Sequence, residues 1–482
     1  MSMQGDRLGK SDKVNGTGWG KRLPVGSTAP EDQFMNASFS SSRLNLAVSC
    51  LDRVMNRTIA RSLTLKDAVA FDDVRQTVVP EKPIETLYIH IPFCHTLCRY
   101  CSFHKIIFNE AQAREYFEAL RQEITQAIAR GFRFHRVYIG GGTTTILEDE
   151  LIRTIELIKS STSVREVTCE SDPVYFKEGH PDRLKGLVDR MSIGIQSFDD
   201  RILKEVARLK KFGCGSQQAE YVSRAIEIIP TVNIDMMYGF GMQTPETIAN
   251  DLEQAIRLRP DQITTYPLTL GIGKNRKNAS RLAGKPAALW PQFLAIKEAM
   301  AERYVMEFPW TFSRNFGQPV ENKYVLDGED CFGVGSGAFG RFGEQFRIST
   351  FDIPDYIRRI RSGQSGITHI KPLKRKALAQ HHFMMMMGYG LLDNQQCKAA
   401  LGKSLWQAFP LELAFLNLNG AIAKQGENYT TTTQGQFIAL KMFSGFLSGM
   451  DFLREQAREL PVTTRARDER NDSVPEAQLR FS

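Results

Sequence analysis

Three of the eight cysteines lie within eight residues of one another, and this cluster is where chemistry is expected first. Cys94, Cys98 and Cys101 have the spacing C-x3-C-x2-C. Three thiolates on one loop can ligate three irons of a [4Fe-4S] cluster and leave the fourth iron open, because such clusters are ordinarily held by four cysteines. The spacing also allows a zinc site with one histidine as its fourth ligand. The nearby histidines are His90, His95 and His104.

Polar residues and glycines recur at the ends of successive predicted strands. Glycines let the main chain approach a small molecule closely, and polar groups are costly to bury without a purpose. At the carboxyl ends of parallel strands they indicate a ligand-binding site. These residues are Gly140–Thr143, Glu170 and Gln196, with Asp235 inside the fifth strand.

The elements that must position these residues follow from the hydrophobic pattern. From residue 86 onward, short apolar runs alternate with amphipathic segments, which is typical of repeated βα units on a parallel sheet. Such units curl into a full or partial barrel. The predicted strands are 86–91, 136–139, 166–169, 191–195, 231–237 and 262–267. The predicted helices are 112–130, 148–159, 199–210, 216–229, 245–258 and 287–304.

The chain of 482 residues is long enough for more than one domain. Its composition, 42% hydrophobic and 24% charged, is that of an ordinary globular protein of the α/β class. We expect four parts. They are a flexible N-terminal arm at 1–45, a barrel with the cysteine loop at 46–348, a smaller helical, winged-helix-like domain at 349–458 and a disordered tail at 459–482.

Several classes of function are disfavoured. No run approaches the ~18 apolar residues of a membrane span, and the first ten residues are polar, so we expect a cytoplasmic protein without a membrane span. The net charge of +8 suits an anionic partner. A winged helix would invite a DNA-binding hypothesis, but no dense Arg/Lys helix accompanies this one, and no nucleic-acid partner is expected. The run Met384–Met387 is interpreted as apolar core, because four consecutive residues of a helix cannot face one ligand.

The motifs together resemble the radical S-adenosylmethionine superfamily, and within it the oxygen-independent coproporphyrinogen III dehydrogenase branch. The resemblance covers about residues 84–450 and implies a partial (βα)6 barrel. It also implies a [4Fe-4S] cluster whose open iron binds S-adenosylmethionine, which is cleaved reductively to a 5'-deoxyadenosyl radical. The segments that carry it are Tyr88–Cys101, Gly140–Thr143, Glu170–Pro173, Gln196–Phe198 and Asn233–Asp235.

The resemblance implies roles for individual positions, although it names no catalytic residue. The cluster ligands would be Cys94, Cys98 and Cys101. The contacts of a first S-adenosylmethionine would be Tyr88, Gly141, Glu170 and Phe339. A second S-adenosylmethionine would be held by Tyr100, Gly142, Thr143, Gln196, Arg208, Asp235 and Thr269.

Departures from the family pattern separate its branches. The dehydrogenase has a further cysteine where this chain has Phe103, and the usual Gly-Gly-Gly-Thr-Pro-Thr has Thr144 in place of proline. The His-Asn-x-x-Tyr-Trp segment of the haem-chaperone branch reads Glu-Asn-Lys-Tyr-Val-Leu here, at residues 321–326. The remaining pattern, including Phe308–Thr311 and Cys331–Phe339, resembles the haem-utilisation branch of anaerobilin synthases.

That branch implies a radical methyltransferase that opens the haem macrocycle without oxygen, gives the linear tetrapyrrole anaerobilin and releases iron. The implied partners are haem as substrate, a low-potential electron donor such as flavodoxin or ferredoxin, and a tetrapyrrole carrier protein. The alternatives are a haem-binding or trafficking protein of the same family and oxygen-independent coproporphyrinogen III dehydrogenase. Candidates for pairing with the haem propionates are Arg314, Arg341 and Arg347.

Overall fold

A computed structural model describes residues 65, 69–70, 83–180, 182–270, 274–314 and 330–459. The expected N-terminal arm at 1–45 lies outside these residues, as do 460–482 of the expected tail. The segment 321–326, which was compared with the haem-chaperone branch, also lies outside them. No helix in these ranges is long and apolar enough to cross a membrane.

A 13-stranded mixed sheet forms the centre of the fold. Its strands are β1 (Val69–Ala70), β2 (Ile84–Ile91), β5 (Phe134–Gly141), β6 (Glu166–Ser171), β7 (Arg190–Gln196), β8 (Thr231–Tyr238), β9 (Gln262–Pro267), β10 (Val305–Phe308), β11 (Thr311–Ser313), β12 (Cys331–Val334), β13 (Phe339–Phe342), β14 (Gln345–Ser349) and β15 (Ile367–Pro372). The order in the sheet is β1-β15-β14-β13-β12-β2-β5-β6-β7-β8-β9-β11-β10. The run from β12 to β9 is parallel throughout, and the strands at both margins are antiparallel. The six predicted strands are confirmed, and they form the βα part of a partial barrel.

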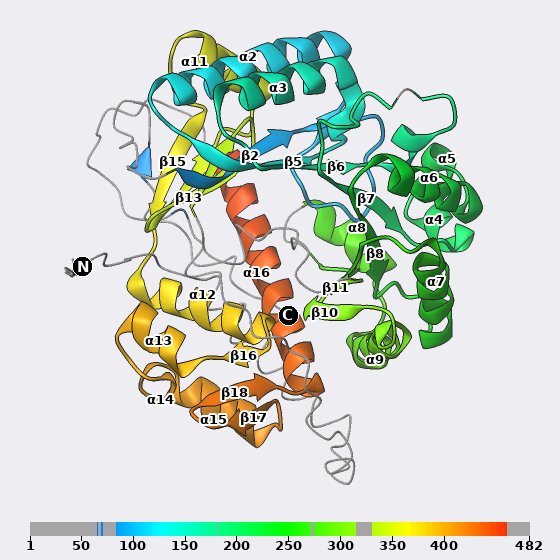
Figure 1. The fold of residues 1–482 in the computed structure, drawn as a ribbon, viewed down its shortest axis with the longest axis vertical. Helices are drawn as coiled ribbons and strands as arrows, with labels where there is room; N and C mark the ends of the chain where they lie inside the picture. The colour runs from blue at the N-terminus through cyan, green and yellow to red at the C-terminus, as the bar shows by residue number, and fades with distance from the viewer. Residues whose placement is uncertain are drawn as a thin grey trace, which may run out of the picture.

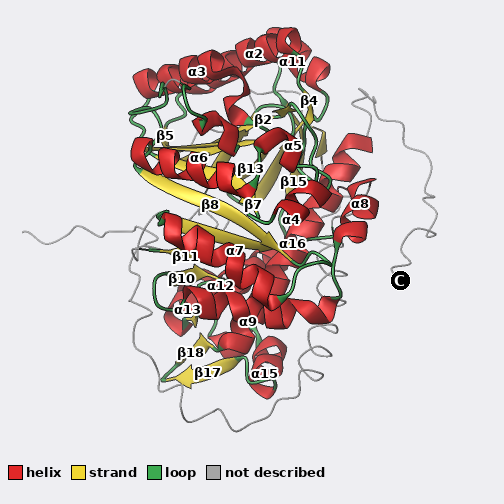
Figure 2. Cartoon of the chain, turned by 90° about the vertical axis from the view of Figure 1, so that its right-hand side faces the viewer, coloured by secondary structure: helices red, strands yellow, loops and turns green. Residues whose placement is uncertain are grey.

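Helices cover the outer face of the parallel strands, and those between residues 110 and 258 connect these strands (Figure 2). They are α2 (Glu110–Ala129), α3 (Glu148–Ser161), α4 (Asp200–Glu205), α5 (Leu209–Phe212), α6 (Gly215–Ile228), α7 (Pro245–Leu258), α8 (Lys274–Leu282) and α9 (Leu289–Met300), followed by α11 (Ile353–Arg361). Helix α2 begins where the Asn109 side chain accepts a hydrogen bond from the Gln112 backbone N–H, and it buries the predicted apolar face that includes Phe117, Leu120 and Ile124. Helices α2, α3 and α11 lie side by side against one part of the sheet (Figure 1).

The large sheet continues to Pro372, beyond the expected barrel boundary at residue 348. The elements after it are α12 (Arg375–Gly388), β16 (Leu391–Leu392), α13 (Asn394–Leu401), α14 (Leu405–Ala408), α15 (Pro410–Leu418), β17 (Ile422–Gln425), β18 (Asn428–Thr431) and α16 (Thr433–Glu459). Strands β16, β18 and β17 form a small antiparallel sheet around the expected hairpin. The residues Met384–Met387 in α12 are all buried, as expected for apolar core.

Helix α16 joins the small C-terminal part to the large sheet. It begins beside β18 and runs back toward β2 and β13 (Figure 1). Its Phe443 ring packs on Phe308 and Trp310, with ring centroids 4.7 and 5.1 Å away. Farther along, Met450 and Leu453 share a buried cluster with Ile348 of β14. The last helix of the described chain is therefore packed into the central part of the fold.

Candidate cofactor-binding site

The three clustered cysteines lie on one loop at the carboxyl end of β2. The short strands β3 (Phe93–Cys94) and β4 (Ile106–Ile107) pair in parallel and hold the two ends of this loop together. The backbone N–H of Ile106 donates to the Pro92 carbonyl at 2.7 Å, and that of Phe108 donates to the Cys94 carbonyl at 3.0 Å. We call residues 94–105 the cysteine loop. Its closed base confines Cys94, Cys98 and Cys101 to one small region.

The donor set fits an iron-sulfur cluster with one open iron. No disulfide involves the described cysteines, so three thiols of one loop are available as ligands. Burial raises the pKa of the Cys94 thiol to about 11, and metal binding would displace that proton. In the described ranges no three His, Cys, Asp or Glu side chains are already arranged as metal ligands.

The glycines after β5 bring the main chain against the cysteine loop. The backbone N–H groups of Gly142 and Thr143 donate to the carbonyls of Ile91 and Phe93, each at 2.7 Å. A Cβ atom on Gly142 would lie 2.5 Å from the Phe93 carbonyl oxygen and 3.0 Å from Cys94 Sγ. The hydroxyl of Thr143 lies 3.9 Å from the same sulfur. Only glycine at position 142 permits this approach.

Glu170 lies beside the first glycines, as the polar residues at the strand ends predict. Its carboxylate accepts hydrogen bonds from the Gly141 backbone N–H at 3.1 Å and from the Tyr138 hydroxyl at 2.7 Å. The Tyr138 ring in turn lies 6.0 Å from that of Tyr88. Three of the four positions expected to contact a first S-adenosylmethionine, at 88, 141 and 170, therefore lie together. The fourth, Phe339, lies on β13 two strands away from β2.

The histidines near the cysteines divide into two buried ones and one exposed one. His90 Nδ1 lies 2.7 Å from the Tyr88 hydroxyl, and His90 Nε2 lies 2.9 Å from the His104 carbonyl. His104 Nε2 lies 3.2 Å from Ser336 Oγ. Burial lowers the pKa of His90 to about 4 and that of His104 well below its usual value. His95 is exposed and packs its ring edge on Phe108. The buried pair is therefore neutral and engaged within the protein.

Arg208 reaches the cysteine loop because the predicted helix over 199–210 is broken. Helix α4 ends at Glu205, Ala207 adopts a left-handed φ of 62°, and α5 begins at Leu209. The Arg208 guanidinium donates to the Tyr100 hydroxyl at 3.4 Å and lies 3.7 Å from Cys98 Sγ. It also donates to the carbonyl of Gly194, two residues before Gln196. Arg208 is one of the positions expected to hold a second S-adenosylmethionine, and it lies beside Tyr100 and Cys98 of the cysteine loop.

The remaining predicted positions are less closely joined. The side chain of Asp235 is held deeper in the barrel by Ser192 and Asn233, each at 3.0 Å. Gln196 ends β7 with a left-handed φ of 74°, and the Thr269 hydroxyl donates to the nearby Pro267 carbonyl at 3.3 Å. The structure therefore brings Asp235 near buried polar partners, while Thr269 stays at the rim after β9.

Sequence reasoning missed the buried polar network around Asp235. Asn233 donates to Ser192 at 2.8 Å and accepts from the Thr264 hydroxyl at 2.8 Å. Arg190 donates to Gln262, which donates to Ser313 at 2.9 Å. Polar residues at alternate positions of otherwise apolar strands are the sequence signal that could have identified this network.

The candidate propionate arginines do not cluster at the cysteine loop. Arg314 pairs with Asp261, which precedes β9, so it lies at the amino ends of the strands. Arg341 pairs in register with Cys331, which pairs with Thr86 near the amino end of β2. Arg347 is buried on the neighbouring strand β14. Arg314 and Arg341 therefore lie toward the end of the sheet opposite the cysteine loop.

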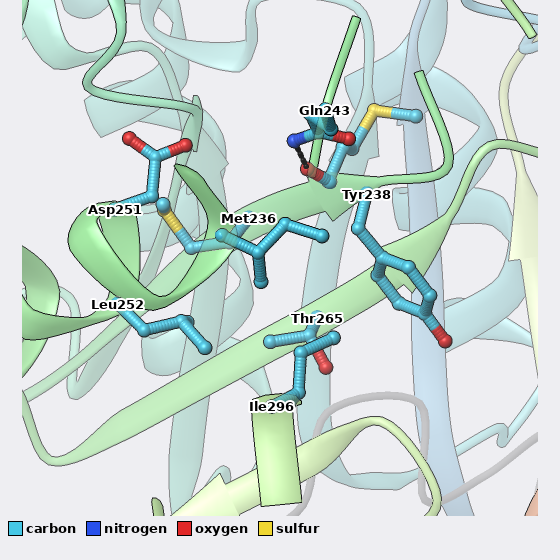
Figure 3. A pocket seen from close by; sticks show the side chains of 9 residues that line it. Met236, Tyr238, Gln243, Asp251, Leu252, Thr265 and Ile296 are labelled. Atoms are coloured by element: carbon cyan, nitrogen blue, oxygen red, sulfur yellow. Dashed lines mark hydrogen bonds between the residues drawn. The ribbon is translucent and has the colours of Figure 1, made fainter. Parts of the chain in front are cut away.

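A small cavity lies elsewhere, between β8, β9 and the helices α7 and α9 (Figure 3). It is lined mostly by apolar side chains, and the Gln243 amide beside it donates to the Met237 carbonyl at 3.1 Å. None of the predicted site residues lines it. One lining residue, Asp251, holds the turn that follows Gln196. Its carboxylate accepts hydrogen bonds from the Ser197 hydroxyl at 2.5 Å and from the Phe198 backbone N–H at 2.8 Å.

Comparison with known proteins agrees with the fold. The family model "Radical SAM superfamily" matches residues 88–255. The solved structure of coproporphyrinogen III oxidase from Escherichia coli, described as a radical SAM enzyme, aligns with a TM-score of 0.62 at 20% identity. The alignment covers 75% of this chain and 90% of that chain, so the fold is shared.

The curated relatives differ in how much of their length is matched. "Heme chaperone HemW" of Bacillus subtilis is 26% identical over 388 residues, which are 76% of this chain and 99% of that protein. "Oxygen-independent coproporphyrinogen III oxidase" of E. coli is 34% identical over 200 residues, 39% of this chain and 42% of that protein. "Anaerobilin synthase" of E. coli O157:H7 is 29% identical over 287 residues, 55% and 62% of the two chains. Residues 88–255 therefore match the radical SAM superfamily, which implies a [4Fe-4S] cluster and S-adenosylmethionine, and over a longer span the chain is similar to HemN- and HemW-type proteins.

Proposed function

We propose that this protein binds haem and transfers it to other proteins, as a radical SAM relative of the haem chaperones. The observation that carries the proposal is the similarity to Heme chaperone HemW of B. subtilis, which extends over 99% of that protein. The similarities to the coproporphyrinogen oxidase and to anaerobilin synthase cover 42% and 62% of those proteins. A similarity over a whole relative supports a shared task better than one over a part.

In this proposal the cysteine loop holds the cluster. Cys94, Cys98 and Cys101 supply the thiolates, and Gly142 leaves room beside Cys94 Sγ. Glu170 presents a carboxylate that can accept hydrogen bonds from the amino or hydroxyl groups of S-adenosylmethionine. When bound and reduced, the cluster would supply the electron for reductive cleavage of S-adenosylmethionine.

Haem would be recognised by charge and by an accessible histidine. The net charge of +8 favours a ligand with two propionates. His95 is exposed beside Cys94, whereas His90 and His104 are buried with their ring nitrogens engaged. A neutral imidazole is a common ligand of haem iron. His95 is thus the histidine of this loop that a haem iron can reach.

A second candidate function is the anaerobic opening of haem by a radical methyltransferase. Two observations favour it. The chain is 29% identical to anaerobilin synthase over 287 residues, and residues 321–326 lack the His and Trp of the chaperone segment. Oxidative decarboxylation of coproporphyrinogen is less favoured, because Phe103 occupies the position of the further cysteine of that branch.

One anaerobic incubation separates these candidates. Cluster-reconstituted protein is mixed with haem, S-adenosylmethionine and a low-potential reductant, and the Soret band and product mass are followed. A persistent, protein-bound Soret band whose haem passes to an apo-haemoprotein is expected for the carrier. Loss of the band with a methylated, iron-free linear tetrapyrrole would overturn haem carriage in favour of ring opening. The variant Cys98→Ala, which cannot complete the cluster, controls for nonenzymatic bleaching.

A further inference from the structure

The cysteine loop touches a helix that lies at the other end of the described chain. Ser102, the residue after Cys101, lies next to Asp451 of helix α16, where its side chain stabilises the charged form of that carboxyl group. Asp451 is only 6% exposed, so this contact is shielded from water. Burying a carboxylate is costly unless its oxygens are bonded. The cysteine loop therefore contacts a buried carboxyl group of helix α16 and not a surface one.

Arg454 makes the second contact between the helix and the loop. It pairs with Asp451 one turn earlier on the same helix face. Its guanidinium carbon lies 5.3 Å from the ring centroid of Phe103, the residue after Ser102. The same carbon lies 5.6 Å from the ring of Phe339 on β13. Both distances are in the range of cation–π attraction, so one guanidinium joins the loop to the sheet.

Helix α16 is itself fixed to the sheet next to these contacts. Met450 and Leu453 are buried in a cluster with Ile348 of β14. One turn beyond Arg454, the guanidinium of Arg458 lies 5.2 Å from the ring of Phe351. A helix held by its neighbours in this way is a rigid support for a loop.

The contacts from α16 complete the support of the cysteine loop. Its base is closed by β3 and β4, and Arg208 reaches it from the opposite margin of the site through Tyr100 and Cys98. Ser102 and Phe103 follow the third cysteine directly, so a change in their position is passed to Cys101 through two peptide bonds at most.

We infer that Asp451 and Arg454 are positioning residues, which hold the cysteine loop in place through Ser102 and Phe103. We call these four residues the α16 latch. The latch makes the geometry of the loop depend on the C-terminal helix. The inference does not depend on whether haem is carried or degraded, because it concerns the loop before any ligand binds.

The latch is tested first on iron-free protein by hydrogen–deuterium exchange of the backbone amides at 96–104. In Arg454→Met these amides are expected to exchange on the order of tenfold faster than in the wild type, because a charge-assisted bond and a ring contact are lost. Arg458→Met is the matched control, since it removes the same charge one turn away and contacts Phe351, whose ring meets the loop at His104 and not at Ser102 or Phe103. It is expected to leave exchange at 96–103 as in the wild type.

A double-mutant cycle identifies the partner. With Phe103→Leu already present, Arg454→Met is expected to accelerate exchange much less than it does alone, because the shared contact is gone. Ser102→Ala provides a milder test of the Asp451 contact in case the helix variants unfold. Equal exchange of the loop in the wild type, Ser102→Ala and a folded Arg454→Met would overturn the inference.

Cluster retention gives an independent reading. After reconstitution, Arg454→Met is expected to lose iron to a chelator several-fold faster than the wild type and Arg458→Met. Loss at the wild-type rate would also contradict the latch. Neither measurement uses haem, so their failure is distinguishable from failure of the proposed function.

Discussion

The carboxylate of Glu170 accepts a hydrogen bond from the backbone N–H of Gly141 at 3.1 Å, which ties the carboxyl ends of β6 and β5 together. A second bond, from the Tyr138 hydroxyl at 2.7 Å, fixes the other carboxylate oxygen. Gly141 has a φ of +121°, which glycine adopts far more readily than other residues. The carboxylate is therefore oriented before a ligand arrives, which lowers the entropic cost of binding.

The substitution Glu170→Gln is expected to weaken S-adenosylmethionine binding on the order of tenfold, because an amide can accept at only one of the two bonded positions and carries no charge. Iron content is expected to stay at the wild-type level. Both are measured on reconstituted protein, by equilibrium dialysis and by iron analysis. Glu166→Gln, at the amino end of the same strand, is the matched control. Unchanged affinity in Glu170→Gln would remove this residue from the site.

Gly142→Ala tests the close approach to the cysteine loop. The added Cβ would lie 2.5 Å from a backbone oxygen of Phe93, which cannot rotate away. We expect a loss of about 1–3 kcal/mol in the free energy of unfolding of the iron-free protein and a lower iron content after reconstitution. Chemical denaturation and iron analysis check both. Gly284→Ala, where the nearest atoms are 3.4 Å away, is expected to change neither quantity appreciably.

The six βα units were predictable because strand periodicity and helix amphipathicity are local signals. The proximity of Gly141 to Glu170 was also predictable, since the two residues lie at the carboxyl ends of neighbouring parallel strands. The position of Arg208 could not be predicted from local sequence patterns. Its segment reads as one helix, and the break at Ala207 that turns the guanidinium toward Tyr100 depends on tertiary contacts.

The contact between Ser102 and Asp451 had no local signal at all. The two residues are far apart in sequence, and α16 reads as an apolar closing helix of a separate domain. Likewise, the amphipathic pattern of residues 245–258 predicted α7 but not that Asp251 would turn inward to Ser197. Long-range polar pairs of this kind follow from how elements pack and not from the period of either one.

Arg208→Lys tests the position expected to hold a second S-adenosylmethionine. Lysine keeps the charge but loses the planar fork that reaches Tyr100 and Gly194 and the stacking on Phe212, whose ring centroid lies 4.0 Å from the guanidinium carbon. In an equilibrium titration we expect the second binding event to weaken at least tenfold while the first is retained. Arg201→Lys, an exposed arginine on α4, is the control. Two unchanged binding events would exclude a role of Arg208 in binding.

Asp251 makes stability depend on pH in a defined window. Desolvation raises its pKa to about 6, against about 3.9 for an unfolded aspartate. The folded state therefore holds the proton more tightly. This group contributes about 3 kcal/mol in total to the free energy of unfolding. The contribution is fully present below about pH 4 and is lost as the pH rises through about 6.

We therefore expect the free energy of unfolding of the wild type, measured relative to that of Asp251→Asn, to fall by about 2 kcal/mol between pH 4 and pH 7. The pairwise difference cancels the titration of all other groups and is obtained from urea unfolding at each pH. Ser197→Ala removes a hydrogen bond that favours the charged carboxylate, so the fall should move to higher pH. Parallel curves for the wild type and Asp251→Asn would show that Asp251 has the same pKa in the folded and the unfolded state. They would also contradict its role as a buried carboxylate that holds the turn after Gln196.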